Sequence, residues 1–64
     1  MNNKELLQEL DSFLERYGVA DSTFGIRAAN DSHLVERVRA GKPIRRSTIL
    51  KIRRYMALAE IESA

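Results

Sequence analysis

The first seventeen residues carry apolar side chains at helical spacing, which leaves this chain few possible folds. The apolar stripe consists of Leu6, Leu7, Leu10, Phe13, Leu14 and Tyr17. At 100° per residue, these positions fall within an arc of about 120° and the charged residues lie outside it. Asn2 and Glu5 can act as a capping pair, and Gly18 is suited to end the helix. The pattern predicts an amphipathic helix from Asn3 to Tyr17.

A second, shorter helix is predicted after Gly18. Asp21 or Ser22 is suited to cap it, and we expect it to run to about Ala29. Residues 30–32, with the sequence Asn-Asp-Ser, then form a sharp turn, because asparagine tolerates positive φ better than most residues.

A third helix is predicted beyond this turn. Leu34, Val35 and Val38 lie on its inner face, and Gly41 and Pro43 close it. The pattern thus describes two short helices joined by about three residues, which is the spacing of a helix-turn-helix.

Ser47 is suited to cap a fourth helix, which we expect to fray near Glu62. Its core stripe is Ile49, Ile52, Met56 and Ala59. No strand pattern or internal repeat competes with this interpretation. The sequence therefore predicts an all-α fold, a compact four-helix domain that spans residues 1–64.

Length and composition restrict the function as well as the fold. A chain of 64 residues has room for one small core. The absence of cysteine excludes disulfides and a thiolate zinc site, and it fits a cytoplasmic location. The longest apolar run covers residues 56–59, far below the ~18 residues that a membrane span requires. We therefore expect a cytoplasmic, nucleoid-associated protein without a membrane segment.

The small net charge of +2 hides a strong polarity along the chain. Residues 1–36 contain three basic and seven acidic side chains, whereas residues 37–64 contain eight basic and two acidic ones. No acidic residue occurs between Arg37 and Ala59. Most of the basic side chains there are arginines, whose planar guanidinium suits phosphates and guanine edges. This half of the chain indicates an acidic binding partner.

Residues 21–40 can be compared with the helix-turn-helix pattern position by position. Counting Asp21 as the first of about twenty positions, the pattern requires apolar residues at the fourth, eighth, fifteenth and eighteenth positions and a small residue at the fifth. These positions hold Phe24, Ala28, Val35, Val38 and Gly25. A small residue is needed at Gly25 because the two helix backbones approach closely there. The segment from 21 to 56 resembles the lambda-repressor-like helix-turn-helix family.

The resemblance implies a four-helix domain without the fifth helix that many members have, with its helix-turn-helix at about residues 21–40. It further implies a small bacterial or phage transcription repressor that occupies promoter DNA and inserts the third helix into the major groove. Family members usually have glycine at the ninth motif position, where this chain has Ala29, and an apolar residue at the tenth, where it has Asn30. The register of the turn around these two residues therefore stays open.

The resemblance also assigns the residues that read bases. They are Ser32, His33, Glu36, Arg37 and Ala40. Arg37 can form a bidentate hydrogen bond with N7 and O6 of guanine, and Ala40 can contact a thymine methyl group. Glu36 can accept a hydrogen bond from cytosine N4, or it can pair with His33 or Arg39 one turn away.

A second set of residues is expected to hold the phosphates. It consists of Ser22, Thr23, Arg39, Lys42, Arg45, Arg46, Ser47 and Thr48. The free amides at the start of the fourth helix add to this set, because a helix N-terminus attracts anions. The sequence leaves the roles of three cations of the fourth helix open: Lys51, Arg53 and Arg54. We favour structural or solvent-exposed roles for Arg53 and Arg54.

Other kinds of site find little support in the sequence. His33 is the only histidine in a chain without cysteine, so no metal site or cofactor is expected. The carboxylates of the first helix lie on its outer face, and no nucleophile, base and orienting group converge, so we expect neither catalysis nor a small-molecule ligand.

Two alternatives and one possible assembly remain. The main competing function is a helical protein-interaction module, an adaptor or inhibitor whose basic half binds an acidic protein. RNA binding is less favoured, because no exposed aromatic platform is evident. Leu58 and Ile61 lie off the core stripe of the fourth helix and are candidate contacts of a homodimer on DNA.

Overall fold

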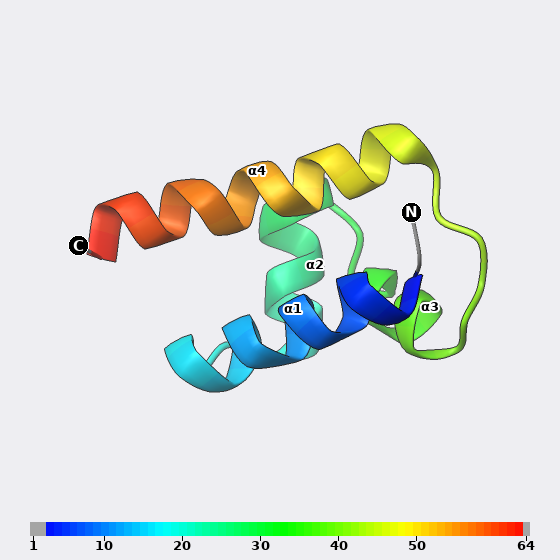
Figure 1. Ribbon diagram of the computed structural model, residues 1–64, viewed down its shortest axis with the longest axis horizontal. Coiled ribbons are helices and arrows are strands. Elements are labelled where there is room, and N and C mark those ends of the chain that lie inside the picture. Colours follow the sequence, from blue (N-terminus) through cyan, green and yellow to red (C-terminus); the bar gives the residue numbers. More distant parts are fainter. Residues whose placement is uncertain (1–2, 64) are drawn as a thin grey trace.

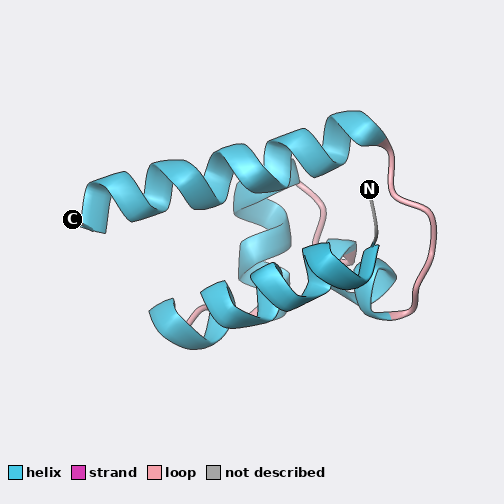
Figure 2. Ribbon diagram, viewed as in Figure 1, coloured by secondary structure: helices cyan, strands magenta, loops and turns pink. Residues whose placement is uncertain are grey.

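The protein forms four helices in the computed structural model, which describes residues 3–63. They are α1 (Asn3–Tyr17), α2 (Asp21–Ala29), α3 (Leu34–Arg39) and α4 (Arg46–Ser63). Figure 1 shows α1 and α4 on opposite sides of α2, with α3 near the start of α1, and Figure 2 shows the loops that join them. The predicted all-α, four-helix fold is confirmed. None of these helices is long and apolar enough to cross a membrane.

The bounds of the helices agree with the prediction at α1 and differ at two of the predicted caps. Asn2, the expected capping residue of α1, lies outside the described residues. The residue before α2 is Ala20, whose carbonyl accepts the backbone N–H of Phe24 at 2.9 Å, and within residues 3–63 no side chain caps this end. The prediction of Asp21 or Ser22 as the cap was wrong. An extended Ala20 already starts the helix, so the Asp21 carboxylate is free to bind an arginine instead.

The start of α4 also lies earlier than expected. The carbonyl of Arg45 accepts the backbone N–H groups of Thr48 and Ile49, both at 3.0 Å. Arg45 is therefore the residue that precedes the helix, and Ser47 lies within its first turn. The prediction of Ser47 as the cap was wrong because the helical hydrogen bonds begin at a backbone carbonyl two positions earlier.

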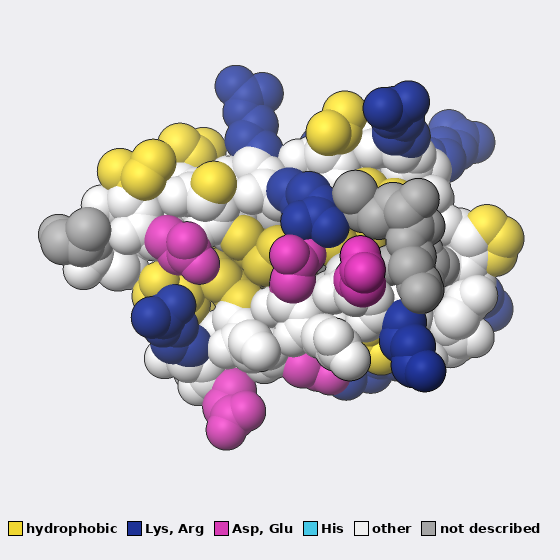
Figure 3. Space-filling view, in the orientation of Figure 1, with side chains coloured by type: hydrophobic (Ala, Val, Ile, Leu, Met, Phe, Trp, Pro, Cys, Tyr) yellow, Lys and Arg dark blue, Asp and Glu magenta, His cyan; other side chains and the backbone are white. Residues whose placement is uncertain are grey.

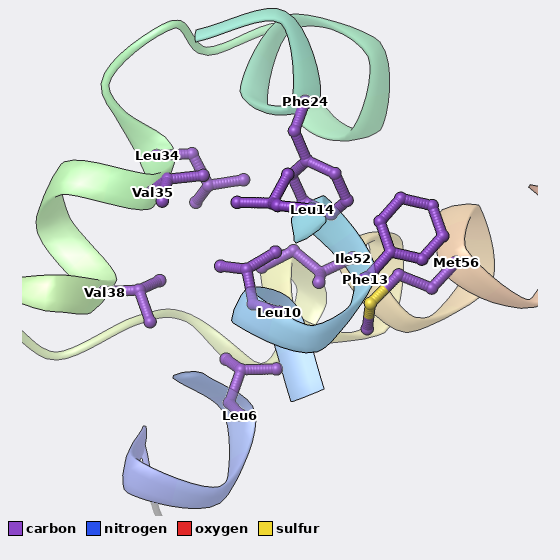
Figure 4. Close-up of a cluster of buried hydrophobic side chains, with 10 residues drawn as sticks. All are labelled: Leu6, Leu10, Phe13, Leu14, Phe24, Leu34, Val35, Val38, Ile52 and Met56. Atoms are coloured by element: carbon purple, nitrogen blue, oxygen red, sulfur yellow. The ribbon is translucent and has the colours of Figure 1, made fainter. Parts of the chain in front are cut away.

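All four helices contribute to one core, whose side chains point toward one another in Figure 4. The core consists of Leu6, Leu10, Phe13, Leu14, Phe24, Leu34, Val35, Val38, Ile52 and Met56. An aromatic cluster joins α1, α2 and α4: the ring of Phe24 is 5.6 Å from that of Phe13 and 5.2 Å from that of Tyr55, both in edge-on arrangements. Within residues 4–63 no polar side chain is buried, so this core depends on apolar packing alone.

The connection between α2 and α3 is a tight turn around one left-handed residue. Asn30 has φ 55° and ψ 40°, and its N–H donates to the carbonyl of Ile26 at 2.9 Å. The next N–H, of Asp31, donates to the carbonyl of Gly25 at 3.1 Å. These bonds settle the register of the turn, because the left-handed residue is Asn30 and not Ala29.

Gly25 is where the backbones of α2 and of this turn meet. A Cβ atom at Gly25 would overlap the carbonyl oxygen of Asp31 and would lie 3.3 Å from the Cβ of Leu34. The need for a small residue at Gly25 is confirmed, although the backbone that approaches it belongs to the turn and not to α3 itself. This close packing at Gly25 holds α3 against α2 at a fixed distance.

The end of α3 is closed by a second glycine. Gly41 has φ 73°, and its N–H donates to the carbonyl of Val38 at 3.1 Å, while the N–H of Lys42 donates to that of Arg37 at 3.1 Å. This pair of bonds is the Schellman motif, which requires a residue with positive φ after the helix. The predicted role of Gly41 in closing the helix is confirmed.

The substitution Gly25→Ala tests the close approach. Alanine favours a helix interior by up to ~1 kcal/mol over glycine, but here its Cβ meets rigid backbone, so we expect a net destabilisation of about 2 kcal/mol or more. Gly41→Ala is the matched control. It places a Cβ in open space at positive φ and should cost about 1–2 kcal/mol from backbone strain alone. Urea unfolding measures both, and an equal or smaller loss for Gly25→Ala would contradict the packing argument.

Candidate nucleic-acid interface

The helix α3 has a buried face and an exposed face. Leu34 and Val35 are 0% exposed and Val38 is 1% exposed, so one side of the helix is fixed in the core. The residues predicted to read bases are all exposed on the other side: Ser32, His33, Glu36, Arg37 and Ala40. The structure thus brings these five residues together on one accessible surface, which we call the α3 surface.

The helix itself is shorter than the stretch of predicted base-reading residues, Ser32 to Ala40. It begins at Leu34 and ends at Arg39, so Ser32 and His33 lie in the turn before it and Ala40 is the residue after it. The reason is a local side-chain bond. Oδ1 of Asp31 accepts the backbone N–H of His33 at 2.9 Å, which stabilises the turn in place of another helical residue.

Asp31 also binds the most prominent base-reading candidate. Its Oδ2 forms an ion pair with Nη2 of Arg37. The pKa of Asp31 lies below its ordinary value, chiefly because the N–H of His33 donates to the carboxylate and also because the Arg37 guanidinium is close. One carboxylate therefore fixes both the turn and the orientation of Arg37. From the sequence, Asp31 was expected only to contribute to the turn; an aspartate just before a short helix is the signal that could have indicated this second role.

Glu36 is paired within the same surface. Its Oε2 lies 3.1 Å from Nδ1 of His33, one helical turn earlier. Of the alternatives that the sequence left open, the structure therefore contains the pair with His33. Both side chains are 74% exposed, so the pair is weak and can exchange for a ligand.

Arg39 occupies a different environment from the other predicted phosphate ligands. Its Nη1 lies 2.8 Å from Oδ1 of Asp11, and its Nε lies 3.2 Å from Oδ2 of Asp21. The hydrogen bond with Asp21 is the main cause of a raised pKa for Arg39. This guanidinium joins α3 to α1 and α2, and it is held by two carboxylates.

The loop between α3 and α4 carries a concentrated positive charge. Lys42 and Arg45 are exposed on it, and Arg46, the first residue of α4, is exposed beside it. Arg37 and Arg45 line an open hollow of about 430 Å³ together with Pro43, Ile44 and Thr48. None of the residues that line this hollow is acidic. A predicted base-reading residue and predicted phosphate-binding residues therefore meet around one basic hollow.

The two helix starts that were predicted to bind phosphate differ in charge. The first turn of α4 has no acidic residue, and Ser47 is exposed while Thr48 is half-buried. The first turn of α2 contains Asp21 beside Ser22 and Thr23. Because a carboxylate competes with phosphate for the positive end of a helix, the start of α4 is the better anion site.

A hollow on another part of the molecule has a different character. It lies between α1 and α4, has a volume of about 490 Å³, and has Phe13 and Met56 among its lining residues. Its charged residues are of both signs, and Nη1 of Arg53 lies 2.8 Å from Oε2 of Glu9. This pair agrees with the structural role favoured for Arg53. Figure 3 shows apolar side chains between the two helices on this face.

Comparisons with protein-family models, with curated proteins and with solved structures give no match for this chain. In the described part of the chain, no group of three or more His, Cys, Asp or Glu residues could hold a metal ion.

The substitution Asp31→Asn tests the role of this carboxylate. Because the folded state lowers the pKa of Asp31 below 3.8, its charge stabilises the fold above that pH, and the stabilisation is lost as the pH falls through the folded-state pKa. We expect Asp31→Asn to lower Tm near pH 7, and the difference from the wild type to shrink at an acidic pH well below 3.8. Thermal unfolding followed by circular dichroism measures this.

Glu15→Gln is the control for the pH experiment. Glu15 is an exposed carboxylate of α1 that forms no ion pair within residues 3–63. Its substitution should leave Tm nearly unchanged at both pH values. A difference between Asp31→Asn and the wild type that persists unchanged to the lowest pH would show that charge is not the cause.

Proposed function

We propose that this protein binds double-stranded DNA at a specific sequence, with α3 in the major groove, and that it acts as a small transcription repressor. One observation carries the proposal. The inner face of α3 is fixed in the core, while its outer face is exposed beside three further cations, Lys42 and Arg45 of the loop and Arg46 at the start of α4. A helix that enters the major groove needs this combination of rigid support and a free polar face.

Arg37 is the residue most suited to read a base. Its guanidinium is oriented by Asp31 before any ligand binds, which reduces the entropy lost when it binds N7 and O6 of a guanine. Ser32 and His33 supply short donors at the start of the same surface. Glu36 exchanges its weak pair with His33 for cytosine N4, and Ala40 contacts a thymine methyl group.

Phosphate binding is assigned to the loop and the start of α4. Lys42, Arg45 and Arg46 are exposed, and the first amides of α4 point away from a helix whose first turn lacks acid. Arg39 is a weaker candidate, because two carboxylates hold it in place. The protein then represses by occupying promoter DNA, with two copies on two half-sites for useful affinity.

Selection from a random duplex library at ~150 mM salt tests the proposal most directly, followed by titration of the selected site against scrambled DNA. A sequence reader should prefer its site by ~10³-fold or more. Equal affinity for all duplexes would reject the proposal. Capture of an acidic protein together with loss of DNA binding at this salt concentration would support the protein-interaction module instead.

Two arginine substitutions separate base contacts from phosphate contacts. Arg37→Ala should lose ~1–3 kcal/mol on the selected site and much less on scrambled DNA, because only the specific complex contains the guanine contact. Arg45→Ala should weaken both complexes alike. Arg16→Ala is the control, because this exposed cation lies near the end of α1, away from the loop. Fluorescence anisotropy measures all three, and equal losses on both duplexes for Arg37→Ala would reject the assigned base contact.

Salt dependence gives an independent test of the phosphate contacts. If about six cations contact phosphates, the slope of log affinity against log salt should be roughly −5. Arg45→Ala should reduce this slope by about one unit, and Arg16→Ala should leave it unchanged. A slope near zero would mean that the loop cations do not bind DNA.

A further inference from the structure

The side of α4 that faces away from the core carries large exposed apolar side chains. Leu50 is 60% exposed, Leu58 52% and Ile61 72%. At 100° per residue they fall within about 80° of one another, opposite the buried Ile52 and Met56. Figure 3 shows apolar side chains toward both ends of this outer edge, with Lys or Arg side chains between them. We call the face formed by Leu50, Arg54, Leu58 and Ile61 the outer stripe.

We propose that the outer stripe binds a second copy of this chain, with the two α4 helices antiparallel. A contact between identical surfaces is closed by a two-fold axis, so each apolar residue can find an apolar partner on the other copy. In the register that pairs the apolar residues, Leu50 of each copy lies opposite Ile61 of the other copy. Leu58 of one copy then packs beside Arg54 of the other copy. The aliphatic carbons of Arg54 cover Leu58 while its guanidinium stays in water.

The charges that flank the stripe favour this orientation. Lys51 and Glu62 are both exposed and lie on the same flank, about 20° apart around the helix axis. In an antiparallel helix pair, like flanks face each other, so Lys51 of each copy lies near Glu62 of the other. Neither residue forms an ion pair within residues 3–63, so both are available. A parallel pair would instead place the basic first halves of both helices side by side.

The same geometry limits the strength of the contact. The two copies of Arg54 come close to each other near the two-fold axis and repel. One helix face per copy also buries less than the ~1,200–2,000 Å² of total area that stable complexes bury. The dimer is therefore weak in solution and is reinforced when both copies are held on one DNA molecule.

The α4 pair extends the proposed function to a dimer on DNA. It depends on that function only for the spacing of the two copies along the duplex. In this register the two α4 starts lie roughly 28 Å apart along the helix axis, at 1.5 Å per residue. That separation is of the same order as the ~34 Å between half-sites one DNA turn apart. Two basic loops would thus approach successive turns of one duplex.

An introduced cysteine pair tests the register in the absence of DNA. The chain contains no cysteine, so Leu50→Cys with Ile61→Cys provides the only thiols. Within one copy these positions are about 16 Å apart along the helix, too far for a disulfide. Between copies they are opposite each other. With oxidised glutathione as the oxidant, we expect a covalent dimer from the double variant and at least ~5-fold less from either single variant, on a denaturing gel.

A charge exchange tests the orientation. Lys51→Glu should weaken self-association about 5-fold or more, because it replaces two attractive pairs with two repulsive ones, and adding Glu62→Lys to the same chain should restore it. Arg54→Leu should strengthen it by removing the repulsion at the axis. Sedimentation velocity measures all three, with helix content by circular dichroism as the control that the exposed substitutions leave the fold intact.

The outcomes distinguish this inference from the proposed function. A covalent dimer and charge rescue establish the α4 pair even if no DNA sequence is preferred. The α4 pair is overturned if the chain stays monomeric at all concentrations, if the single cysteine variants crosslink as much as the double variant, or if Glu62→Lys does not rescue Lys51→Glu. Binding to a single half-site then tests DNA recognition separately. If both hold, Ile61→Asp, which lies at the far end of α4 from the phosphate-binding start, should keep affinity for one half-site and lose the cooperative gain on two.

Discussion

The contact between Gly25 and the carbonyl of Asp31 sets the geometry on which the rest of the structure depends. Because no Cβ separates the backbones there, α3 sits close enough to α2 for its three apolar residues to enter the core. Asn30 supports this contact by adopting the left-handed conformation that reverses the chain in a few residues. A core formed by apolar packing alone then leaves the opposite side of α3 free. The exposed α3 surface is thus a direct consequence of one close backbone approach.

Carboxylates from the acidic first half of the chain decide what the arginines of the second half can do. Asp11 and Asp21 hold Arg39, which therefore connects three helices. Glu9 holds Arg53 across the gap between α1 and α4. Ion pairs within the fold thus hold part of the basic second half, while Lys42 and Arg45 of the loop before α4 stay exposed. This selection concentrates positive charge beside the α3 surface and leaves the outer stripe of α4 as a separate surface.

Much of this arrangement could be predicted, and the failures have a common cause. The bounds of α1, the close approach at Gly25 and the closing role of Gly41 follow from periodicity and from the special conformations of glycine. The predicted caps of α2 and α4 were wrong, because the helical hydrogen bonds begin at the backbone carbonyls of Ala20 and Arg45, and the Asp21 carboxylate pairs with Arg39 instead. A motif locates polar residues along a helix, but it does not indicate which charged partner each will find.

The sequence by itself determined four amphipathic segments, the turn between two of them and the separation of acidic from basic residues, since these depend on neighbours within one or two helical turns. Only the tertiary structure decided that Arg39 is bound to Asp11 of α1 and Asp21 of α2, and that Arg53 is bound to Glu9 of α1. Ion pairs between helices depend on distances of a few ångströms between residues far apart in the chain. Those distances exist only after the core has packed.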